Sequence, residues 1–487
     1  MKQTVTKFTA ILMILAALLS GCASGQTTGD PSQQVSTENT SAVEEAVAEE
    51  TELPDNLPEK DYNGESVFVT IYSSDEQRYD MVTEDTETGE VLHDAVYRRN
   101  LAVEDRYNIV FEISETSDTN SLHASVVAQS EDFELLFYPI CYGYTLANQG
   151  DFLSTDDLPY IDLEKIWWDQ SLRRDLSINN KLYFMSGDIS PSSMNMSACI
   201  LFNKKLFDQH ALAYPYDMVR EGTWTMDAVS TLIDGLTVDM DGDGKISSKA
   251  DSTDVFGLTG WMWSIPYGLF YGAGERFVKN NAEGVPCLDY DLDRVVSIYE
   301  KIYDIIITKQ SYFAVNTAEE YENTRKVFQT DRSFLLDVKL YDMGNLRDME
   351  SDFGILPIPK YDETQNSYIT FVNAASNMIS VPVMVSDPEK CSILLEAMAS
   401  ESFKNLTPSF KTSILKGKYV RDEESSEMVD IIIRNRVFDI AYIYKIAGFE
   451  NVIRLQIMAN KEEVVSAIQK IHSAGETKLE ELVLQFQ

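Results

Sequence analysis

Three aspartates on alternate positions form the clearest chemical pattern in this sequence. Asp239, Asp241 and Asp243 are followed directly by Gly244 and Lys245. Carboxylates on alternate residues can converge on one hard cation only where the chain bends sharply, and a glycine after the third aspartate permits that bend. The spacing matches the start of an EF-hand calcium loop, in which the backbone carbonyl of the seventh residue, here Lys245, supplies a further oxygen.

This loop departs from the EF-hand pattern at its twelfth position. Ala250 stands where a bidentate glutamate is usual, so Asp251, Asp254 or a carboxylate from elsewhere must complete the metal shell. The alternative interpretation is a solvated turn rich in aspartate and glycine. We predict a structural calcium ion, with Asp239, Asp241, Asp243, Lys245 and Asp251 as its ligands.

Four aromatic residues crowd the end of a predicted strand and the segment after it, namely Trp261, Trp263, Tyr267 and Tyr271. Sugars present apolar C–H faces that stack on aromatic rings, while polar side chains bind their hydroxyl groups. Aromatic clusters also fill protein cores, so a binding role and a packing role both stay open.

Motifs for catalysis are weak in comparison. The chain has four histidines and contains no HExxH pair, no GxSxG elbow and no P-loop, because Gly244-Lys245 is followed by Ile246. The paired carboxylates of a glycoside hydrolase could be drawn from 79 acidic residues, but no pair stands out. We therefore predict a protein that is not an enzyme and has no organic cofactor.

Charge and composition narrow the choice of partners. The 487 residues suffice for two or three domains, and 44% of them are hydrophobic, which is enough for real cores. The 40 basic and 79 acidic residues give a net charge of −39. A field of that sign repels nucleic acid and anionic membrane surfaces, and it tolerates neutral or cationic ligands and divalent cations.

The N-terminus has the features of a secretory signal. Two lysines precede the apolar run 8–19, which is too short to span a bilayer, and Leu19-Ser20-Gly21-Cys22 resembles a lipobox. The alternative is an ordinary secretory peptide with a coincidental cysteine. We predict a lipoprotein signal peptide at 1–21, lipidation of Cys22, and a polar, acidic, disordered tether at 22–60. The protein is then extracytoplasmic and held at the cell membrane by its lipid alone.

Strands alternate with helices along the rest of the chain. The pattern predicts strands at 67–72, 109–113, 134–138, 199–202, 333–338 and 376–382, and helices at 91–107, 288–307, 389–403 and 428–444. Thr225 can cap a helix whose buried face is marked by Met226, Val229 and Ile233. This alternation predicts an α/β protein with parallel sheets.

Ligand sites of parallel sheets lie at the carboxyl ends of the strands. Polar or aromatic residues stand at or just after several of these ends, although such residues can also cap the next helix. Together with the aromatic group, the expected ligand contacts are Ser74, Asp75, Tyr138, Tyr142, Trp261, Trp263, Tyr271, Asp337 and Tyr341.

The middle of the chain resembles a known family. Phe202-Asn203-Lys204-Lys205-Leu206-Phe207, then Pro215, then Thr223-Trp224 are similar to the strand, short helix and helix start of the extracellular solute-binding proteins of ABC importers, of the maltose-binding-protein type. The resemblance extends over nearly all of the chain beyond about residue 61. It implies a two-lobed periplasmic-binding-protein-like fold of type II, with a ligand cleft between lobes joined by a hinge. It places lobe 1 at 61–190 plus 328–372 and lobe 2 at 191–327 plus 373–487.

The resemblance also implies a function. The expected ligand is a small polar solute such as a mono- or oligosaccharide, the expected partners are ABC permease subunits, and the protein is expected to be a monomer. The family's acidic–basic pair after a first-lobe strand is replaced here by Cys141-Tyr142, which leaves the specific solute open. A secreted glycoside hydrolase and a lipoprotein that senses or scaffolds are the alternatives.

Overall fold

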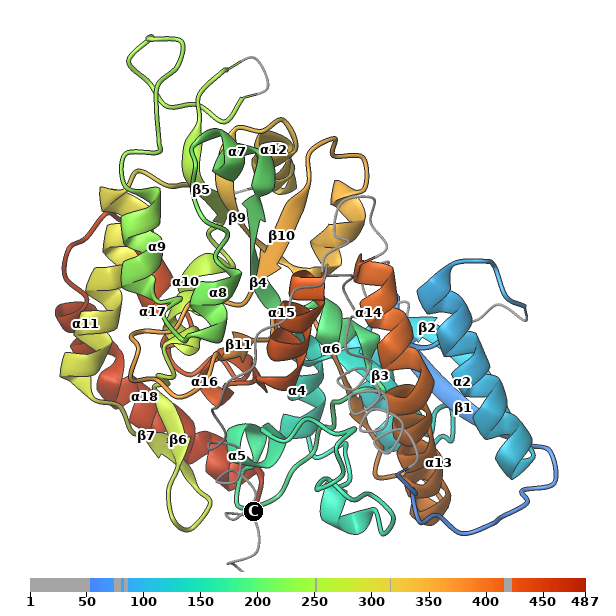
Figure 1. Cartoon of the computed structure of the whole chain (residues 1–487). Coiled ribbons are helices and arrows are strands. Elements are labelled where there is room, and N and C mark those ends of the chain that lie inside the picture. The colour runs from blue at the N-terminus through green and yellow to red at the C-terminus, as the bar shows by residue number, and fades with distance from the viewer. Residues whose placement is uncertain (1–52, 74–79, 83–85, 250–251, 316, 416–422) are drawn as a thin grey trace, which may run out of the picture. The chain divides into compact units, whose positions relative to one another are not determined.

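The computed structural model describes residues 53–487 apart from 74–79, 83–85, 250–251, 316 and 416–422, and Pro54–Gln487 cluster as one unit. The predicted signal peptide, Cys22 and most of the predicted tether therefore lie outside the described residues. Two mixed sheets with helices packed on them organise the described chain (Figure 1). No helix among the described residues is long and apolar enough to cross a membrane.

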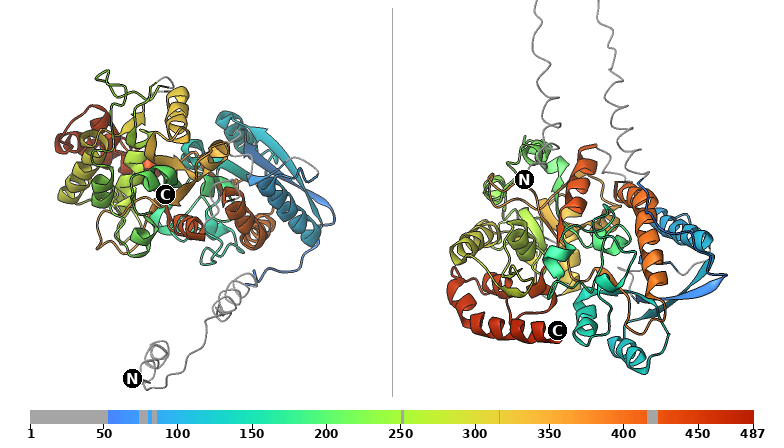
Figure 2. Two further views of the ribbon diagram at one scale, coloured as in Figure 1. Left: turned by 45° about the horizontal axis from the view of Figure 1, so that its top comes forward. Right: turned by 90° about the horizontal axis from the view of Figure 1, so that it is seen from below.

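The first sheet has the strand order β12-β3-β1-β2. β1 (Glu65–Tyr72) runs parallel to β2 (Ile109–Thr116) and β3 (Leu135–Pro139), while β12 (Asn377–Ser380) runs antiparallel to β3. α2 (Val91–Tyr107) connects β1 to β2, as the sequence predicts, and α3 (Thr119–Ala128) connects β2 to β3. α13 (Pro388–Glu401), from much later in the chain, packs against α2 (Figures 1 and 2).

The second sheet has the order β10-β4-β9-β5-β8. β5 (Phe256–Trp261) runs parallel to β8 (Tyr312–Ala314) and β9 (Ser333–Lys339), so the carboxyl ends of these strands share one edge. β4 (Ala198–Asn203) is antiparallel to β9 and to β10 (Phe353–Leu356). Asn203 ends β4 and caps α7 (Lys204–Gln209), because its side chain accepts a hydrogen bond from the Leu206 N–H at 3.0 Å.

The lobe boundaries expected from the resemblance are wrong in two places. β9 and β10, within the segment 328–372 expected in lobe 1, pair with β4 and β5 in the second sheet. β12, expected in lobe 2, pairs with β3 in the first sheet. All residues of β9 are buried, as its central place between two strands requires, and its sequence carries no mark of which sheet it joins.

Two chain segments cross side by side from one sheet to the other. Antiparallel bridges join Met185 to Ile379 and Ser197 to Val372, so 185–197 lies along 372–379. We call these two segments the junction. Beside it, β11 (Thr370–Phe371) pairs in parallel with β13 (Arg436–Val437). β13 interrupts the helix predicted at 428–444, which forms instead as α15 (Glu423–Arg434) and α16 (Ile440–Ile443).

The junction encloses a buried carboxyl group. Asp80 accepts hydrogen bonds from the Ser192 hydroxyl and from the Asn377 amide, each at 2.7 Å, and the Arg99 guanidinium lies close by. Burial raises the pKa of Asp80 to about 6 despite these donors. The two crossing segments are therefore tied to each other through one carboxyl group.

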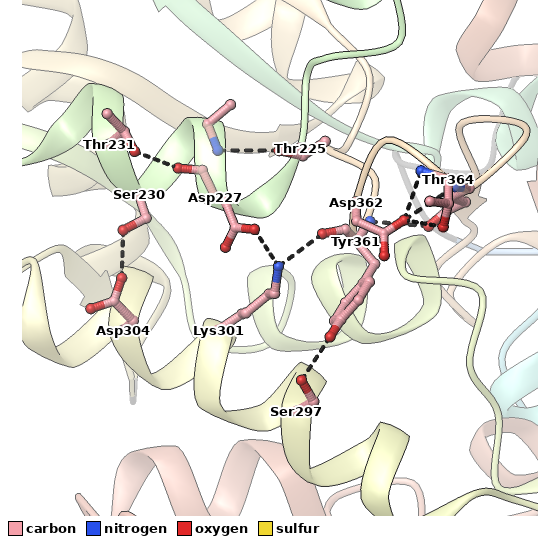
Figure 3. A network of polar contacts seen from close by, with 12 residues as sticks. Thr225, Asp227, Ser230, Thr231, Ser297, Lys301, Asp304, Tyr361, Asp362 and Thr364 are labelled. Atoms are coloured by element: carbon pink, nitrogen blue, oxygen red, sulfur yellow. Dashed lines mark hydrogen bonds and ion pairs between the residues drawn. The ribbon is translucent and has the colours of Figure 1, made fainter.

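Two helices beside the second sheet are joined by a polar network (Figure 3). Thr225 caps α9 (Met226–Ile233), which confirms that prediction, by accepting a hydrogen bond from the Ala228 N–H. Lys301 of α11 (Leu292–Tyr303) lies 2.5 Å from the Asp227 carboxylate and donates to the Tyr361 carbonyl at 3.2 Å. This network fixes α9 against α11.

The other described elements complete the layers around the two sheets. They are α4 (Ile140–Asn148), α5 (Leu172–Leu176), α6 (Pro191–Asn195), α8 (Tyr216–Arg220), α10 (Ile265–Gly272), α12 (Ala318–Gln329), α14 (Thr407–Leu415), α17 (Val452–Met458), α18 (Val465–Gln485), the hairpin β6 (Val278–Asn280) and β7 (Pro286–Leu288), the 3-10 helices at Thr155–Asp157 and Leu340–Leu346, and the π-helical turns at Asp304–Thr308 and Ser402–Leu406.

Candidate ligand-binding site at the strand ends

The end of β5 carries an aromatic stack beside a cation. The Trp261 ring stacks on Tyr321 of α12, with ring centroids 5.0 Å apart and an interplanar angle of 28°. Lys339, the last residue of β9, places its Nζ 5.6 Å from the Trp261 ring centroid. The parallel pairing of β5 with β9 brings these side chains together, because both strands end at the same edge.

A second tryptophan, two residues after Trp261 in the sequence, also has a cation against its ring. Trp263 is 39% exposed, and the Arg454 guanidinium carbon lies 3.5 Å from its ring centroid. Arg454 belongs to α17 and donates from Nε to the Tyr267 hydroxyl at 3.1 Å. Burial raises the pKa of Tyr267 to about 12, so this hydroxyl keeps its proton and donates to Asn451 Oδ1 at 2.8 Å.

The first sheet presents tyrosines at its own strand ends. Tyr72, at the end of β1, stacks on Tyr142 of α4 with centroids 5.5 Å apart and an interplanar angle of 20°. Tyr142 is 46% exposed, so its ring is available to a ligand. The Tyr138 and Tyr72 rings meet edge to face with centroids 5.1 Å apart, and Tyr138 is itself buried.

Helix contacts connect the two groups of strand ends. α4 contacts α16, and Tyr144 of α4 meets Tyr444 edge-on at 5.8 Å. Tyr442 of α16 packs on Tyr267 at 5.1 Å, next to Arg454. The strand ends of both sheets thus belong to one continuous set of contacts. We call the following residues the strand-end cluster: Tyr72, Tyr142, Trp261, Trp263, Lys339 and Arg454.

Three predicted contacts are buried beneath this cluster. Tyr138, Tyr271 and Asp337 have almost no exposed surface. The Tyr271 hydroxyl donates to Asp439 Oδ1 at 3.0 Å, and its ring stacks on Phe371. The structure therefore places these three residues under the candidate site, where they support it.

Asp337 is a buried carboxyl group beneath the cluster. Burial raises its pKa well above the usual range, although the Ser264 hydroxyl donates to Oδ1 at 3.2 Å and the nearby charge of Lys339 opposes the shift. Its Oδ2 has no hydrogen-bond partner among the described residues.

Tyr341 lines a cavity of about 210 Å³ together with Glu90, Asn195 and Arg347. Glu90 caps α2 of the first sheet and Tyr341 follows β9 of the second, so this cavity lies between elements of both sheets. Ser74 and Asp75 lie outside the described residues.

The acidic loop brings together three carboxylates, of which one was only an alternative ligand. Oxygens of Asp239, Asp241 and Asp254 lie within 4.8 Å of one another. Asp254 is fully buried, and the N–H groups of Ser247 and Met240 hold its pKa below the usual range although burial opposes them.

Asp243 does not join this group of carboxylates and instead accepts a hydrogen bond from the Lys245 N–H at 2.8 Å. Asp251 lies outside the described residues. The donor set of Asp239, Asp241 and Asp254 is hard and anionic, and it fits calcium.

Comparison with known proteins identifies the fold. No protein-family model and no curated protein sequence matches this chain. A cyclo/maltodextrin-binding protein in complex with maltotetraose superposes with a TM-score of 0.54 at 12% identity, over 87% of this chain and 97% of that chain. An ABC transporter solute-binding protein from Thermotoga lettingae bound with α-D-tagatose gives 0.52 at 12% identity, over 85% and 100%. A sugar transporter from Rhizobium etli in an open conformation gives 0.53 at 13% identity, over 86% and 98%.

This chain has the two-lobed α/β fold of these solute-binding proteins. In this binding-protein fold the two sheets are the centres of the two lobes, and the junction is where the chain passes between them. The strand-end cluster accordingly takes Tyr72 and Tyr142 from one lobe and its other four residues from the other.

Sequence reasoning missed the two cations of the cluster. Lys339 follows directly after a predicted strand, so its position could have been found by the same rule that singled out Asp337. Arg454 lies near the C-terminus, far from β5 in sequence, and no local pattern links it to Trp263. Only the packing of α17 against α10 brings Arg454 there.

Proposed function

We propose that this protein is an extracytoplasmic substrate-binding protein that captures a mono- or oligosaccharide and delivers it to the permease of an ABC importer. Lipid on Cys22 holds it at the cell membrane. The protein itself carries out no chemistry, and ATP hydrolysis belongs to the transporter.

The observation that carries this proposal is the exposure of aromatic rings at the strand ends of both lobes. A core aromatic residue would be buried, whereas Tyr142 and Trp263 keep a large part of their surface accessible. Such rings offer flat apolar faces to the C–H groups of a sugar. The polar groups beside them, Asn451 and Arg454, are suited to bind hydroxyl oxygens.

Binding is coupled to a movement of the lobes in this proposal. Stacking on rings from both lobes is complete only when the lobes close on the sugar, so the ligand favours the closed state by its higher affinity for it. The junction is the place where the chain bends. Two closed lobes then form the surface that the permease recognises.

Calorimetric titration of the full-length protein with a carbohydrate panel tests this function. At least one sugar should bind, and none should be converted to product during a long incubation. Replacement of Trp263 by alanine should weaken binding, while Tyr361→Ala, a change in the network of Figure 3, should leave affinity unchanged. Hydrolysis of a bound sugar, or the absence of any binding, contradicts the proposal.

Calcium has a structural role in this proposal. Asp239, Asp241 and Asp254 hold it at the base of the loop between α9 and β5, next to the Val238–Val255 bridge, and the ion offsets the repulsion among their carboxylates. Saturation at about a hundredfold above the dissociation constant would stabilise the fold by about 2.7 kcal/mol. Thermal melts with and without chelator should differ for the wild type and coincide for Asp254→Asn. A wild-type melting temperature that does not change when chelator is added contradicts the calcium proposal.

Lipidation is tested separately. A Cys22→Ala variant should be released from the membrane fraction and should fail to incorporate labelled fatty acid. If the variant stays in the membrane fraction and incorporates fatty acid as the wild type does, the lipid anchor on Cys22 is contradicted.

A further inference from the structure

Two cations of the strand-end cluster are almost fully enclosed. Lys339 is 7% exposed and Arg454 is 5% exposed. Each lies over a tryptophan ring, and these tryptophans, Trp261 and Trp263, are two residues apart. The cations thus come from different elements to one edge of the second sheet.

Neither cation has a carboxylate partner among the described residues. The Lys339 Nζ contacts the Met196 sulfur at 3.7 Å, and no carboxylate oxygen of the described chain lies within 4.0 Å of it. Arg454 donates to Tyr267, Asn451 and the sulfur of Met458, and it too forms no ion pair in the described part of the chain. Their partners are therefore aromatic rings, sulfur and neutral oxygen.

The nearby acidic groups are directed elsewhere. Burial raises the pKa of Asp337, and the charge of Lys339 acts on it in the opposite direction without an ion pair between the two residues. Asp342 is held by Arg325 and by the Tyr321 hydroxyl. Glu450 accepts hydrogen bonds from the Gly448 N–H and from the Asn451 amide. None of these three carboxyl groups forms an ion pair with Lys339 or Arg454.

An enclosed charge without a counter-charge is unfavourable, and proteins usually pair it or lose it. This chain has 79 acidic residues against 40 basic ones, so a lack of carboxylates cannot explain two unpaired cations. Their position at the strand ends, where the binding-protein fold places its ligand, offers an explanation. The missing counter-charge belongs to the ligand.

We propose that the solute bound at the strand-end cluster is an anionic carbohydrate, with its ring stacked on Trp261 or Trp263 and its acidic group bound by Lys339 and Arg454. This inference rests on the proposed function and narrows it. It also revises the expectation from net charge, because two cations without an ion-pair partner among the described residues stand at these strand ends although the whole chain is strongly negative. The chemistry fits a uronic acid first, since a carboxylate is the group that pairs with arginine in two parallel hydrogen bonds.

Calorimetric titration of the full-length protein with matched pairs of sugars tests the proposal. The pairs are galacturonate with galactose and glucuronate with glucose, with their short oligomers, and a sugar phosphate and a sugar sulfate form separate arms. The acidic member of a pair should bind at least about tenfold more tightly than its neutral isostere. The phosphate and sulfate arms decide which anionic group fits best.

Variants locate the effect on the two cations. Lys339→Met and Arg454→Met should each reduce the affinity for the acidic sugar by about tenfold and shrink the difference between acidic and neutral sugars. Lys339→Arg keeps the charge and should keep the preference. Lys301→Met is the matched control, because Lys301 also lies over an aromatic ring, that of Tyr361, and should leave both affinities unchanged.

Salt dependence gives a test that needs no variant. Raising sodium chloride from about 50 to about 500 mM should weaken binding of the acidic sugar and leave that of a neutral sugar unchanged. Equal or tighter binding of the neutral sugar, or a Lys339→Met protein that prefers the acidic sugar as strongly as the wild type, overturns the inference and leaves the proposed function standing. Failure of every sugar to bind overturns both.

Discussion

Two lysines of the second lobe lie over aromatic rings, and their surroundings differ in one respect. Lys301 Nζ lies 4.3 Å from the Tyr361 ring centroid and 2.5 Å from the Asp227 carboxylate (Figure 3). Lys339 Nζ lies 5.6 Å from the Trp261 ring centroid, without a carboxylate within 4.0 Å among the described residues. A lysine ammonium over an aromatic ring thus occurs once with a carboxylate partner, at Lys301, and once without one among the described residues, at Lys339.

The difference separates a structural contact from a candidate binding contact. The side chains of Lys301 and Asp227 are 20% and 68% exposed, so water solvates this pair and it contributes only about 0.2–1 kcal/mol. Lys339 is 7% exposed, and no acidic side chain of the described chain forms an ion pair with it. A position that is unfavourable for the empty protein is one that a ligand can improve.

The largest effect on stability is expected at Asp80, a buried acidic group that, unlike Lys339, has hydroxyl and amide hydrogen-bond partners among the described residues. Asp80 in the junction has a pKa of about 6, raised by burial, against 3.8 when unperturbed. The folded state therefore holds this proton to a higher pH than the unfolded chain, so its stabilising contribution is complete below about pH 4 and is lost as pH rises to about 6. The loss amounts to about 3 kcal/mol.

Asp80→Asn, which cannot ionise, should escape this loss. Urea unfolding at several pH values should show the variant gaining stability relative to the wild type between about pH 4 and pH 7. If plots of the free energy of unfolding against pH stay parallel for the variant and the wild type, Asp80 ionises beside the junction as easily as in water.

The next effect concerns the aromatic partners of the two kinds of site. Trp263→Ala should weaken sugar binding by about 1–3 kcal/mol, because the sugar loses one of the rings on which it stacks. Titration calorimetry measures this loss directly. Tyr361→Ala should cost stability through the network of Figure 3 without changing affinity. Equal effects of both variants on affinity would break the distinction between the two sites.

The smallest expected effect is on the stability of the unliganded protein, where the two lysine variants should change the free energy of unfolding in different directions. Lys301→Met should destabilise by about 0.2–1 kcal/mol because an ion pair is lost. Lys339→Met should leave stability unchanged or raise it by about 1 kcal/mol, because an uncompensated charge is replaced by an apolar side chain of similar length. Denaturant unfolding without ligand compares the two, and a large destabilisation by Lys339→Met would show that its charge supports the fold.

Local sequence patterns anticipated the elements better than their assembly. The helix at 91–107 and the Thr225 cap followed from residue types alone, because periodicity and capping are local properties. The sheet that each strand joins was not predictable in this way. β9 is buried throughout and would fit the centre of either sheet, and its pairing with β4 and β5 is decided by contacts between residues far apart in the sequence.

The candidate site shows the same limit. Trp261, Trp263 and Tyr142 were found because they follow strand ends, whereas Arg454 needed the tertiary packing of a helix close to the C-terminus. Tyr271 and Asp337 follow the same pattern as the exposed residues but are buried, because α10 and the end of β9 are covered by later segments. Strand-end position predicts nearness to a site and leaves accessibility open.

The paired crossing segments of the junction have a consequence for how the lobes can move. The two segments are joined at two separate points, by the bridges Met185–Ile379 and Ser197–Val372, and the short helix α6 lies between these points in the first segment. Two such attachments would steer the lobes along one arc of approach. A sugar entering from solvent would then always meet the same two walls, and little of its binding free energy would go into choosing among different closures.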